Sequence, residues 1–151
     1  ETLSFKKGDF CRVKCEIPFE PGELVAKAFK SGKLVAEDKL ITAGKAEKLF
    51  LRPLKYGNES DRLIHVEMEV QDAKGIRCPV NPVVHFKVSG AGILRGVING
   101  DTKSNQRFNC SSLKLHEGRG LAVICIKKAG KISLNADLEI NEKTIRASVD
   151  L

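Results

Sequence analysis

The chain has 151 residues, of which 42% are hydrophobic and 30% are charged, a composition typical of a folded globular protein and not of a disordered one. This length is sufficient for one domain with a sizeable core, or for one complete domain and part of another. No apolar run approaches the roughly 20 residues that span a bilayer, so we expect no membrane partner.

The formal net charge of +7 raises the question of a nucleic-acid partner. The lysines are spread singly along the chain, apart from the adjacent pairs Lys6–Lys7 and Lys127–Lys128. Proteins that bind nucleic acid usually interleave basic residues with exposed stacking aromatics. This chain has no Trp and one Tyr, so we expect no nucleic-acid partner.

Period-two alternation of apolar and polar residues dominates the chain and predicts an all-β fold. The clearest case is KISLNADLEI, in which five apolar residues from Ile132 to Ile140 share one face. No stretch of ten or more residues keeps a helical period with caps. We expect strands at residues 10–18, 23–30, 33–42, 47–53, 62–70, 83–89, 93–98, 119–127, 131–140 and 143–150.

The connections between these strands indicate how they are arranged. Lys30–Lys33 (KSGK) and Lys128–Lys131 (KAGK) each predict a tight hairpin, because a glycine tolerates the positive φ of such turns. Short strands at roughly ten-residue spacing, broken by Gly, Pro and Asn, are typical of a sandwich. The fold class that we predict is an Ig-like antiparallel β-sandwich, preceded by part of a second Ig-like domain.

Small and charged residues at Thr42–Lys48 suggest a domain boundary. Residues 46–151 have about the size of a complete Ig-like (invasin-like) sandwich. Residues 1–45 are too few for a sandwich, and we interpret them as the later strands of a partial Ig-like domain. An incomplete domain predicts exposed sheet edge or apolar surface on residues 1–45, through which the chain could self-associate. Because the chain begins at Glu1 without Met, we expect a fragment or a processed product.

The five cysteines are Cys11, Cys15, Cys78, Cys110 and Cys125. An odd count without a CxxC pair is a poor disulfide framework and a poor zinc site. Cys11 and Cys15 share a face of an expected strand but lie roughly 13 Å apart, too far for a bridge. The favoured interpretation is small buried hydrophobes. The alternative is one bridge between Cys110 and Cys125 in an oxidising compartment.

The stretch VSGAGILRGVINGD follows an expected strand and resembles a dinucleotide-binding fingerprint. In that fingerprint the third glycine comes three positions after the second and opens a helix. Here Gly96 comes four positions after Gly92, and a strand end and a turn follow. We therefore expect Gly90, Gly92 and Gly96 to shape a bulge or tight bends, and we expect no cofactor.

Two polar groups are candidate metal sites. Asn99-Gly100-Asp101 could begin a calcium loop, but the next residues supply too few ligands, so a turn is favoured. His65, Glu67 and Glu69 share one strand face and could flank a metal, but a solvated face is the favoured interpretation. We expect no metal at either group.

No sequence pattern indicates catalysis. HExxH, the G-x-S-x-G elbow and a P-loop are absent, and His85 and His116 have no partner nearby in the sequence. We therefore predict no catalytic residues. Sugar binding by a sandwich commonly uses exposed aromatic platforms, and a chain with no Trp and one Tyr nearly lacks them, which argues against sugar binding. We expect the seven Phe residues to lie in the core.

Three longer stretches are similar to one enzyme family. Ile17–Leu51 resembles the segment that ends one Ig-like domain and opens the next in bacterial β-galactosidases of glycoside hydrolase family 2. The stretch Leu63–Asp101 resembles the following module: within it, Val70–Gly75 carries V-x-D-x-x-G, and Phe86–Asp101 carries F-x-V-x-G-x-G-x-L-x-G-x-x-N-G-D. Residues 118–140 are similar to the closing part of that module.

The resemblance implies a non-catalytic accessory region of a much larger, β-galactosidase-like enzyme. The catalytic barrel of such an enzyme would lie upstream, so this chain alone is not expected to be an enzyme. Its partners would be the upstream domains of its own parent chain, in the bacterial periplasm or outside the cell. The alternatives are an adhesin-type Ig-like module of a cell surface and a carbohydrate-binding module.

Overall fold

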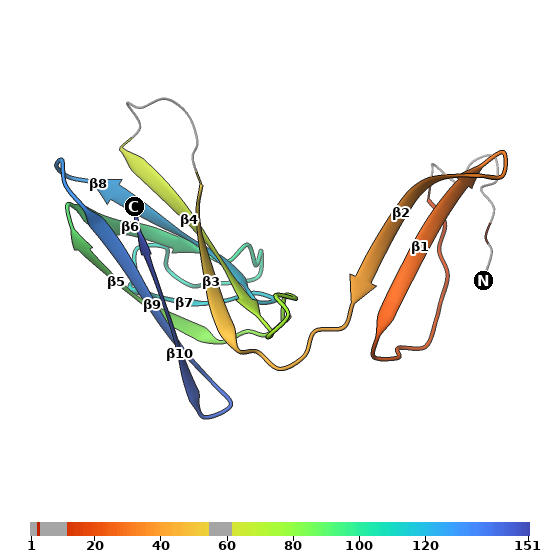
Figure 1. Cartoon of the computed structure of the whole chain (residues 1–151). Coiled ribbons are helices and arrows are strands. Elements are labelled where there is room, and N and C mark those ends of the chain that lie inside the picture. The colour runs from red at the N-terminus through yellow and green to blue at the C-terminus, as the bar shows by residue number, and fades with distance from the viewer. Residues whose placement is uncertain (1–2, 4–11, 55–61) are drawn as a thin grey trace. The chain divides into compact units, whose positions relative to one another are not determined.

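The computed structural model describes residues 3, 12–54 and 62–151, and in that part the chain forms strands and no helix (Figure 1). No helix able to cross a membrane therefore occurs within those residues. The strands in chain order are β1 (Glu23–Lys30), β2 (Lys33–Ile41), β3 (Lys48–Leu54), β4 (Leu63–Gln71), β5 (Val83–Gly90), β6 (Gly92–Ile98), β7 (Ser112–Lys114), β8 (Arg119–Ile126), β9 (Ile132–Ile140) and β10 (Lys143–Asp150).

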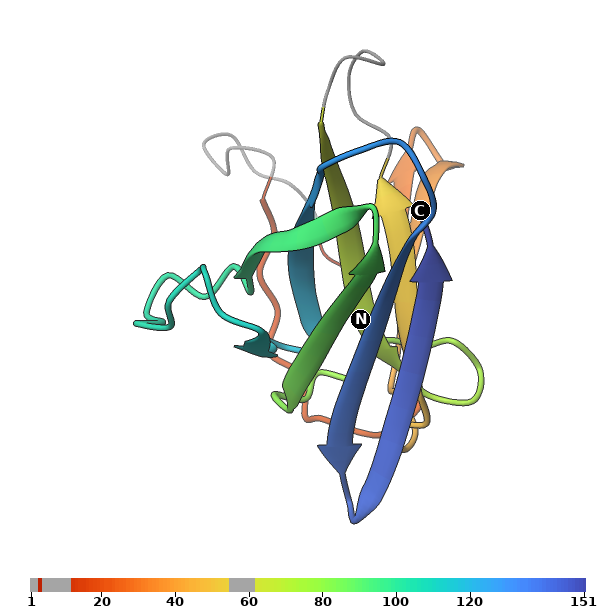
Figure 2. The ribbon, with the colours of Figure 1, turned by 90° about the vertical axis from the view of Figure 1, so that its left-hand side faces the viewer.

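The chain consists of two compact units, Glu1–Thr42 and Ala43–Leu151. The second unit is a sandwich of two four-stranded sheets, ordered β10-β9-β5-β7 and β3-β4-β8-β6, in which all neighbours are antiparallel. Figure 2 shows the two sheets as facing layers. This distribution of strands between the sheets is that of an immunoglobulin fold, so the predicted Ig-like sandwich is confirmed.

The core lies between the two sheets and follows the alternation in the sequence. Val66, Met68 and Val70 of β4 are buried, whereas the residues between them are half-buried on the outer face. In β9, every second residue from Ile132 to Leu138 is buried. The faces predicted for these strands are therefore confirmed.

The hairpin predicted at Lys128–Lys131 is wrong. β8 pairs with β4 and β6, whereas β9 pairs with β5 and β10 in the other sheet. Lys128–Lys131 therefore crosses from one layer to the other, and the backbone N–H of Lys128 reaches the Ala91 carbonyl. Gly130, with φ of +139°, permits the bend, but a short glycine turn does not specify which strands pair on either side of it.

The first unit consists of the hairpin β1–β2 and the residues that precede it. Ser31 and Gly32 both have positive φ, at 49° and 76°, as the predicted tight turn requires. Every described residue from 12 to 42 is exposed. Exposed apolar side chains, among them Leu24, Phe29 and Leu40, agree with the expectation for an incomplete sandwich.

One expected strand is not observed, and one observed strand was not expected. Residues 12–18 form no strand, and residues 10 and 11 lie outside the described residues. Apolar and polar residues alternate there, but these residues pair with no strand in the part of the chain that the structure describes, and a strand is not stable by itself. The three-residue strand β7 was not predicted, because so short an element carries no period.

Candidate functional site

The glycine-rich stretch after β5 carries the chain from one sheet to the other. Gly90 ends β5 and Gly92 begins β6, so Ala91 joins strands of different layers. Gly90 has φ of +86°, and a Cβ atom there would lie 2.1 Å from the Lys131 carbonyl oxygen. These glycines permit a close backbone crossing, and the strand β6 follows them in place of a phosphate-binding helix.

The bulge and the turn that follow are also structural. The pairing of β6 with β8 shifts between Leu94 and Gly96, which marks a β-bulge. The Asp101 backbone N–H donates to Asn99 Oδ1 at 3.0 Å, and Gly100 has φ of +76°. This hydrogen bond makes an Asx turn, so the interpretation of Asn99-Gly100-Asp101 as a turn is confirmed.

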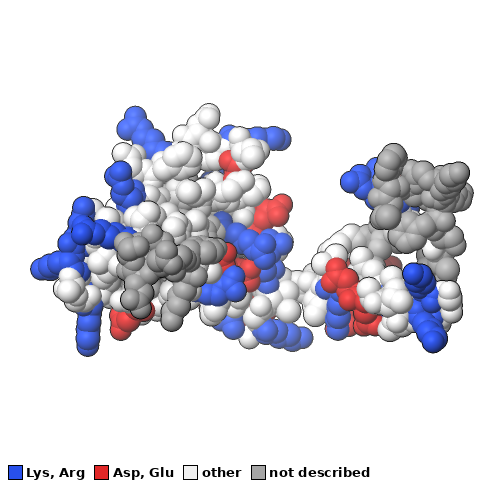
Figure 3. Space-filling model, turned by 90° about the horizontal axis from the view of Figure 1, so that it is seen from above, with Lys and Arg blue, Asp and Glu red and all other residues white. Residues whose placement is uncertain are grey.

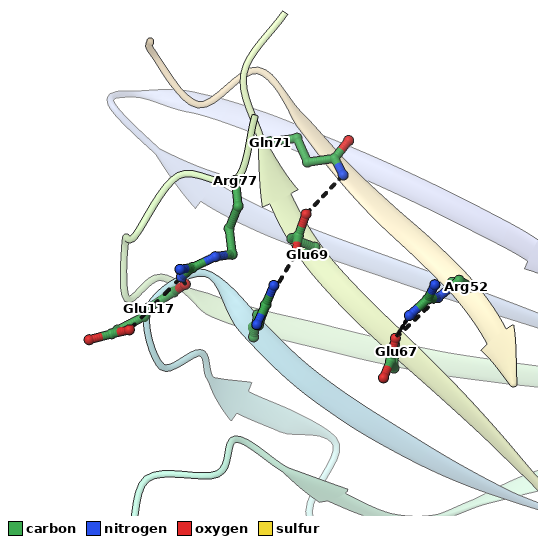
Figure 4. Close-up of polar contacts among 7 residues, drawn as sticks. Arg52, Glu67, Glu69, Gln71, Arg77 and Glu117 are labelled. Carbon is green, nitrogen blue, oxygen red and sulfur yellow. Dashed lines mark hydrogen bonds and ion pairs between the residues drawn. The ribbon is translucent and has the colours of Figure 1, made fainter. Parts of the chain in front are cut away.

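The second candidate metal site lies on the outer face of β4, where His65, Glu67 and Glu69 are half-buried. Arg52 Nε donates to Glu67 Oε2 at 3.1 Å, and Arg119 Nε donates to Glu69 Oε2 at 3.1 Å. Figure 4 shows Arg52 and Glu67 pointing toward one another. Because each carboxylate is paired with a guanidinium, this face is a row of ion pairs. Within the described residues, no three His, Cys, Asp or Glu side chains form a group that could hold a metal ion.

An open groove of about 670 Å³ lies over these ion pairs, on the outer face of the sheet β3-β4-β8-β6. Phe50 of β3 and Arg119 of β8 line it, together with Ile98–Gly100 at the end of β6. A second hollow of about 220 Å³ is also lined by Ile98–Gly100 and extends to Phe108. The two hollows therefore share one stretch of backbone in their lining. We call them together the polar groove.

The phenylalanines are not distributed as the sequence suggested. Of those in the described residues, Phe86 is buried, but Phe50 is 48% exposed and Phe108 67% exposed. Phe19 and Phe29, in the first unit, are exposed as well. The prediction that the Phe residues lie in the core is wrong for these four. Phe50 has the outward parity in β3, and Phe108 belongs to the long β6–β7 connection, which projects from the sandwich in Figure 2.

A buried carboxylate is the polar feature that sequence reasoning missed. Asp72 is 5% exposed and accepts hydrogen bonds from the backbone N–H groups of Gly44, Lys74 and Ile76 at 2.8–2.9 Å. The Gly44 bond has the largest effect and lowers the pKa of Asp72; burial opposes it, and the bonds from Ile76 and Lys74 lower the pKa further. The pattern D-x-x-G was available as a signal for this Asx turn.

The cysteines occupy different environments. Cys78 is buried, as the small-hydrophobe interpretation requires, and burial followed by the nearby negative charge raises the pKa of its thiol. Cys15 is exposed, which contradicts that interpretation there. Cys110 and Cys125 are both free thiols, so the alternative bridge between them is not formed. Cys11 lies outside the described residues.

The charged side chains form no single band on the face seen in Figure 3, where Lys and Arg project singly or in small groups around the sandwich. His85 of β5 and His116 are both exposed. His116 belongs to a backbone bridge with Arg119. Neither histidine belongs to a group of possible metal ligands in the described part of the chain.

Residues 55–145 match the model of the glycoside hydrolase family 2 C-terminal domain 5. The chain belongs to this family. It is 38% identical over 135 residues to the beta-galactosidase BoGH2A of Bacteroides ovatus, a match that covers 87% of the chain and 16% of that protein. The resemblance noted in the sequence is therefore confirmed, and the chain spans about a sixth of the length of this curated relative.

Solved structures of the same family share the fold. A glycosyl hydrolase family 2 member from Bacteroides cellulosilyticus is 29% identical with a TM-score of 0.82, over 91% of this chain and 19% of that chain. A beta-glycosidase from Bacteroides vulgatus is 26% identical with a TM-score of 0.71, over 89% and 18%. In each case the match is a small part of a longer glycosidase.

Proposed function

We propose that this family 2 C-terminal domain is a non-catalytic accessory module of a larger, β-galactosidase-like glycoside hydrolase, and that it packs against other domains of its parent chain. The relatives that it matches are about five to six times as long as the matched part, as the coverage of 16–19% implies. Their names and their source in Bacteroides support a parent enzyme in the periplasm or outside the cell.

The observation that carries the packing proposal is the composition of β8. Ala122 and Ile124 are fully buried in the core, yet Val123 and Cys125, which have the opposite parity, are also apolar. Cys125 pairs with Leu63 on one side and with Ile93 on the other. We call Leu63, Ile93, Val123 and Cys125 the β8 patch. A patch of this kind on the outer face of a sheet is typical of a surface that another module covers.

The first unit supports a second contact with the parent chain. On one face of the β1–β2 hairpin, Lys27 pairs with Glu37 at 3.3 Å and Lys39 with Glu23 at 2.6 Å. The opposite face carries Leu24, Ala26, Ala28, Ala36 and Leu40, with the charged Asp38 opposite Ala26. A two-stranded sheet is marginally stable by itself. We propose that residues 1–45 complete an Ig-like domain whose remaining strands come from the parent, and that residues 46–151 are a domain of their own.

Substitution of the β8 patch tests the packing. In the parent enzyme, Val123→Lys with Ile93→Lys should lower the melting temperature and expose the module to proteolysis, because two charges would be placed in an apolar interface. In the 151-residue chain the same pair should leave the circular dichroism spectrum unchanged, since neither side chain lies in the core. Val83→Lys is the matched control, because Val83 is 45% exposed on the outer face of the other sheet. If the Val123→Lys, Ile93→Lys parent kept the same melting temperature and protease resistance as the Val83→Lys parent, the packing proposal would be wrong.

Turnover measurements test the accessory role. The 151-residue chain should not hydrolyse an aryl β-galactoside, whereas the parent protein should. Hydrolysis by the pure chain would show that it carries catalytic groups of its own.

A further inference from the structure

We propose that the polar groove is a binding site for a neutral oligosaccharide. The proposal deepens the proposed function, on which it rests for the availability of glycans to the parent enzyme. It assigns a ligand class to a surface that the packing proposal does not use. Phe50 and Arg119 lie opposite Glu69, whereas Leu63 and Cys125 of the β8 patch pair with each other at the other end of β4.

Two aromatic rings give the groove its apolar platforms. Phe50 lines the larger hollow and Phe108 the smaller, and Ile98–Gly100 lines both. Each ring is about half exposed or more, at 48% and 67%. The C–H face of a pyranose packs on such a ring, and aromatic side chains bury a large apolar area for few rotatable bonds. An oligosaccharide, unlike a single sugar, is long enough to contact a platform in each hollow.

Planar polar groups beside the Phe50 platform are held in fixed positions. Gln71 Nε2 donates to Glu69 Oε1 at 3.0 Å, while Glu69 Oε2 accepts from Arg119 Nε at 3.1 Å. The terminal amino groups of Arg119 make no further hydrogen bond with any described residue, and its side chain is 64% exposed. A guanidinium held through Nε presents parallel N–H donors that suit two adjacent hydroxyl groups. Ordered donors and acceptors lose little entropy when a polar ligand binds.

The charge of the groove selects against other ligands. In the larger hollow the two carboxylates, Glu67 and Glu69, are each paired with an arginine, so that these four side chains sum to zero; Asp101 lines the smaller hollow. An anion would be repelled by the carboxylate beside each guanidinium, and a cation by the guanidinium beside each carboxylate. A neutral ligand with many hydroxyl groups can bind by hydrogen bonds without breaking either ion pair. Because no charge would be neutralised on binding, the affinity should change little with ionic strength.

Titration calorimetry on the 151-residue chain tests the site, with neutral β-linked hexasaccharides of glucose, galactose, mannose and xylose as probes. At least one should bind, with an affinity that is similar at about 50 and about 500 mM NaCl. Phe50→Ala and Phe108→Ala should each weaken that binding by about threefold to tenfold, through loss of the ring contact. Arg119→Gln should weaken it as well. Phe19→Ala is the matched control, since Phe19 is an 81% exposed ring of the first unit, and it should have no effect.

Each other outcome would overturn the site. Absence of binding to all four probes excludes an oligosaccharide site on this chain. Binding that survives both phenylalanine substitutions, in variants with an unchanged circular dichroism spectrum, would lie elsewhere on the molecule. Preference for a polyanion such as polygalacturonate, with strong salt dependence, would show a cationic surface instead. These results can be told apart from a failure of the proposed function. If the parent hydrolyses β-galactosides while this chain binds no probe, only the proposal of a binding site in the polar groove is contradicted.

Discussion

At the residue scale, the Asp72 carboxylate joins the start of the sandwich to the loop after β4. Oδ2 accepts the Gly44 N–H, and Oδ1 accepts the N–H groups of Lys74 and Ile76. If the carboxylate were lost, three backbone N–H donors would have no acceptor. An unsatisfied buried donor destabilises the folded state by more than a typical hydrogen bond stabilises it. One side chain therefore ties Gly44 to the turn at Asp72–Ile76.

Asp72→Asn should lower the melting temperature of the 151-residue chain by several degrees at pH 7, because an amide cannot accept from both sides. The folded-state pKa of Asp72 lies below its unfolded value of about 3.9. Its ionised form therefore adds stability above that value, and the contribution is lost as the pH falls through the folded-state pKa. The difference between wild type and variant should accordingly narrow on acidification. Asp101→Asn is the control, because the Asp101 carboxylate accepts one backbone N–H, that of Lys103, in an exposed turn. An equal loss of melting temperature in this variant would contradict the special role of Asp72.

At the element scale, the crossing between β5 and β6 depends on a glycine for two separate reasons, positive φ and lack of space. Gly90→Ala combines strain at φ of +86° with a contact of 2.1 Å to the Lys131 carbonyl oxygen, and should lower the free energy of unfolding by about 2 kcal/mol or more. Gly100→Ala has similar φ, +76°, but nothing lies within 4 Å, so the loss should be about 1 kcal/mol. Urea unfolding measures both, and equal losses would show that the close approach does not matter.

The elements also show how far local pattern determines the fold. Alternation located nine of the strands within two residues, because a half-buried strand needs period two wherever it pairs. It could not decide that Lys128–Lys131 joins different sheets, since pairing partners depend on tertiary contacts. The polar groove was missed for the same reason: Phe50, Glu69 and Arg119 meet only through the register of three strands. The alternation in β3 was available as a signal that Phe50 faces outward, but composition suggested a core residue.

At the scale of the whole molecule, the buried core found among the described residues belongs to the second unit. All of its buried residues lie between Leu49 and Ile145, whereas the described residues from 12 to 42 are exposed throughout. A hairpin with no core of its own contributes little to the stability of a neighbouring domain, and its free strand edges favour pairing with another chain. Stability and self-association should therefore reside in different units.

Deletion of residues 1–42 separates these two properties. The fragment 43–151 should unfold cooperatively, with a melting temperature within about 2 °C of that of the 151-residue chain, because it retains the whole core. In sedimentation velocity at rising concentration, the 151-residue chain should form larger species through β1 and β2, and the fragment should remain monomeric. A much lower melting temperature would mean that the first unit stabilises the sandwich. Self-association that persists in the fragment would instead assign it to an edge of the sandwich, β10, β7, β3 or β6.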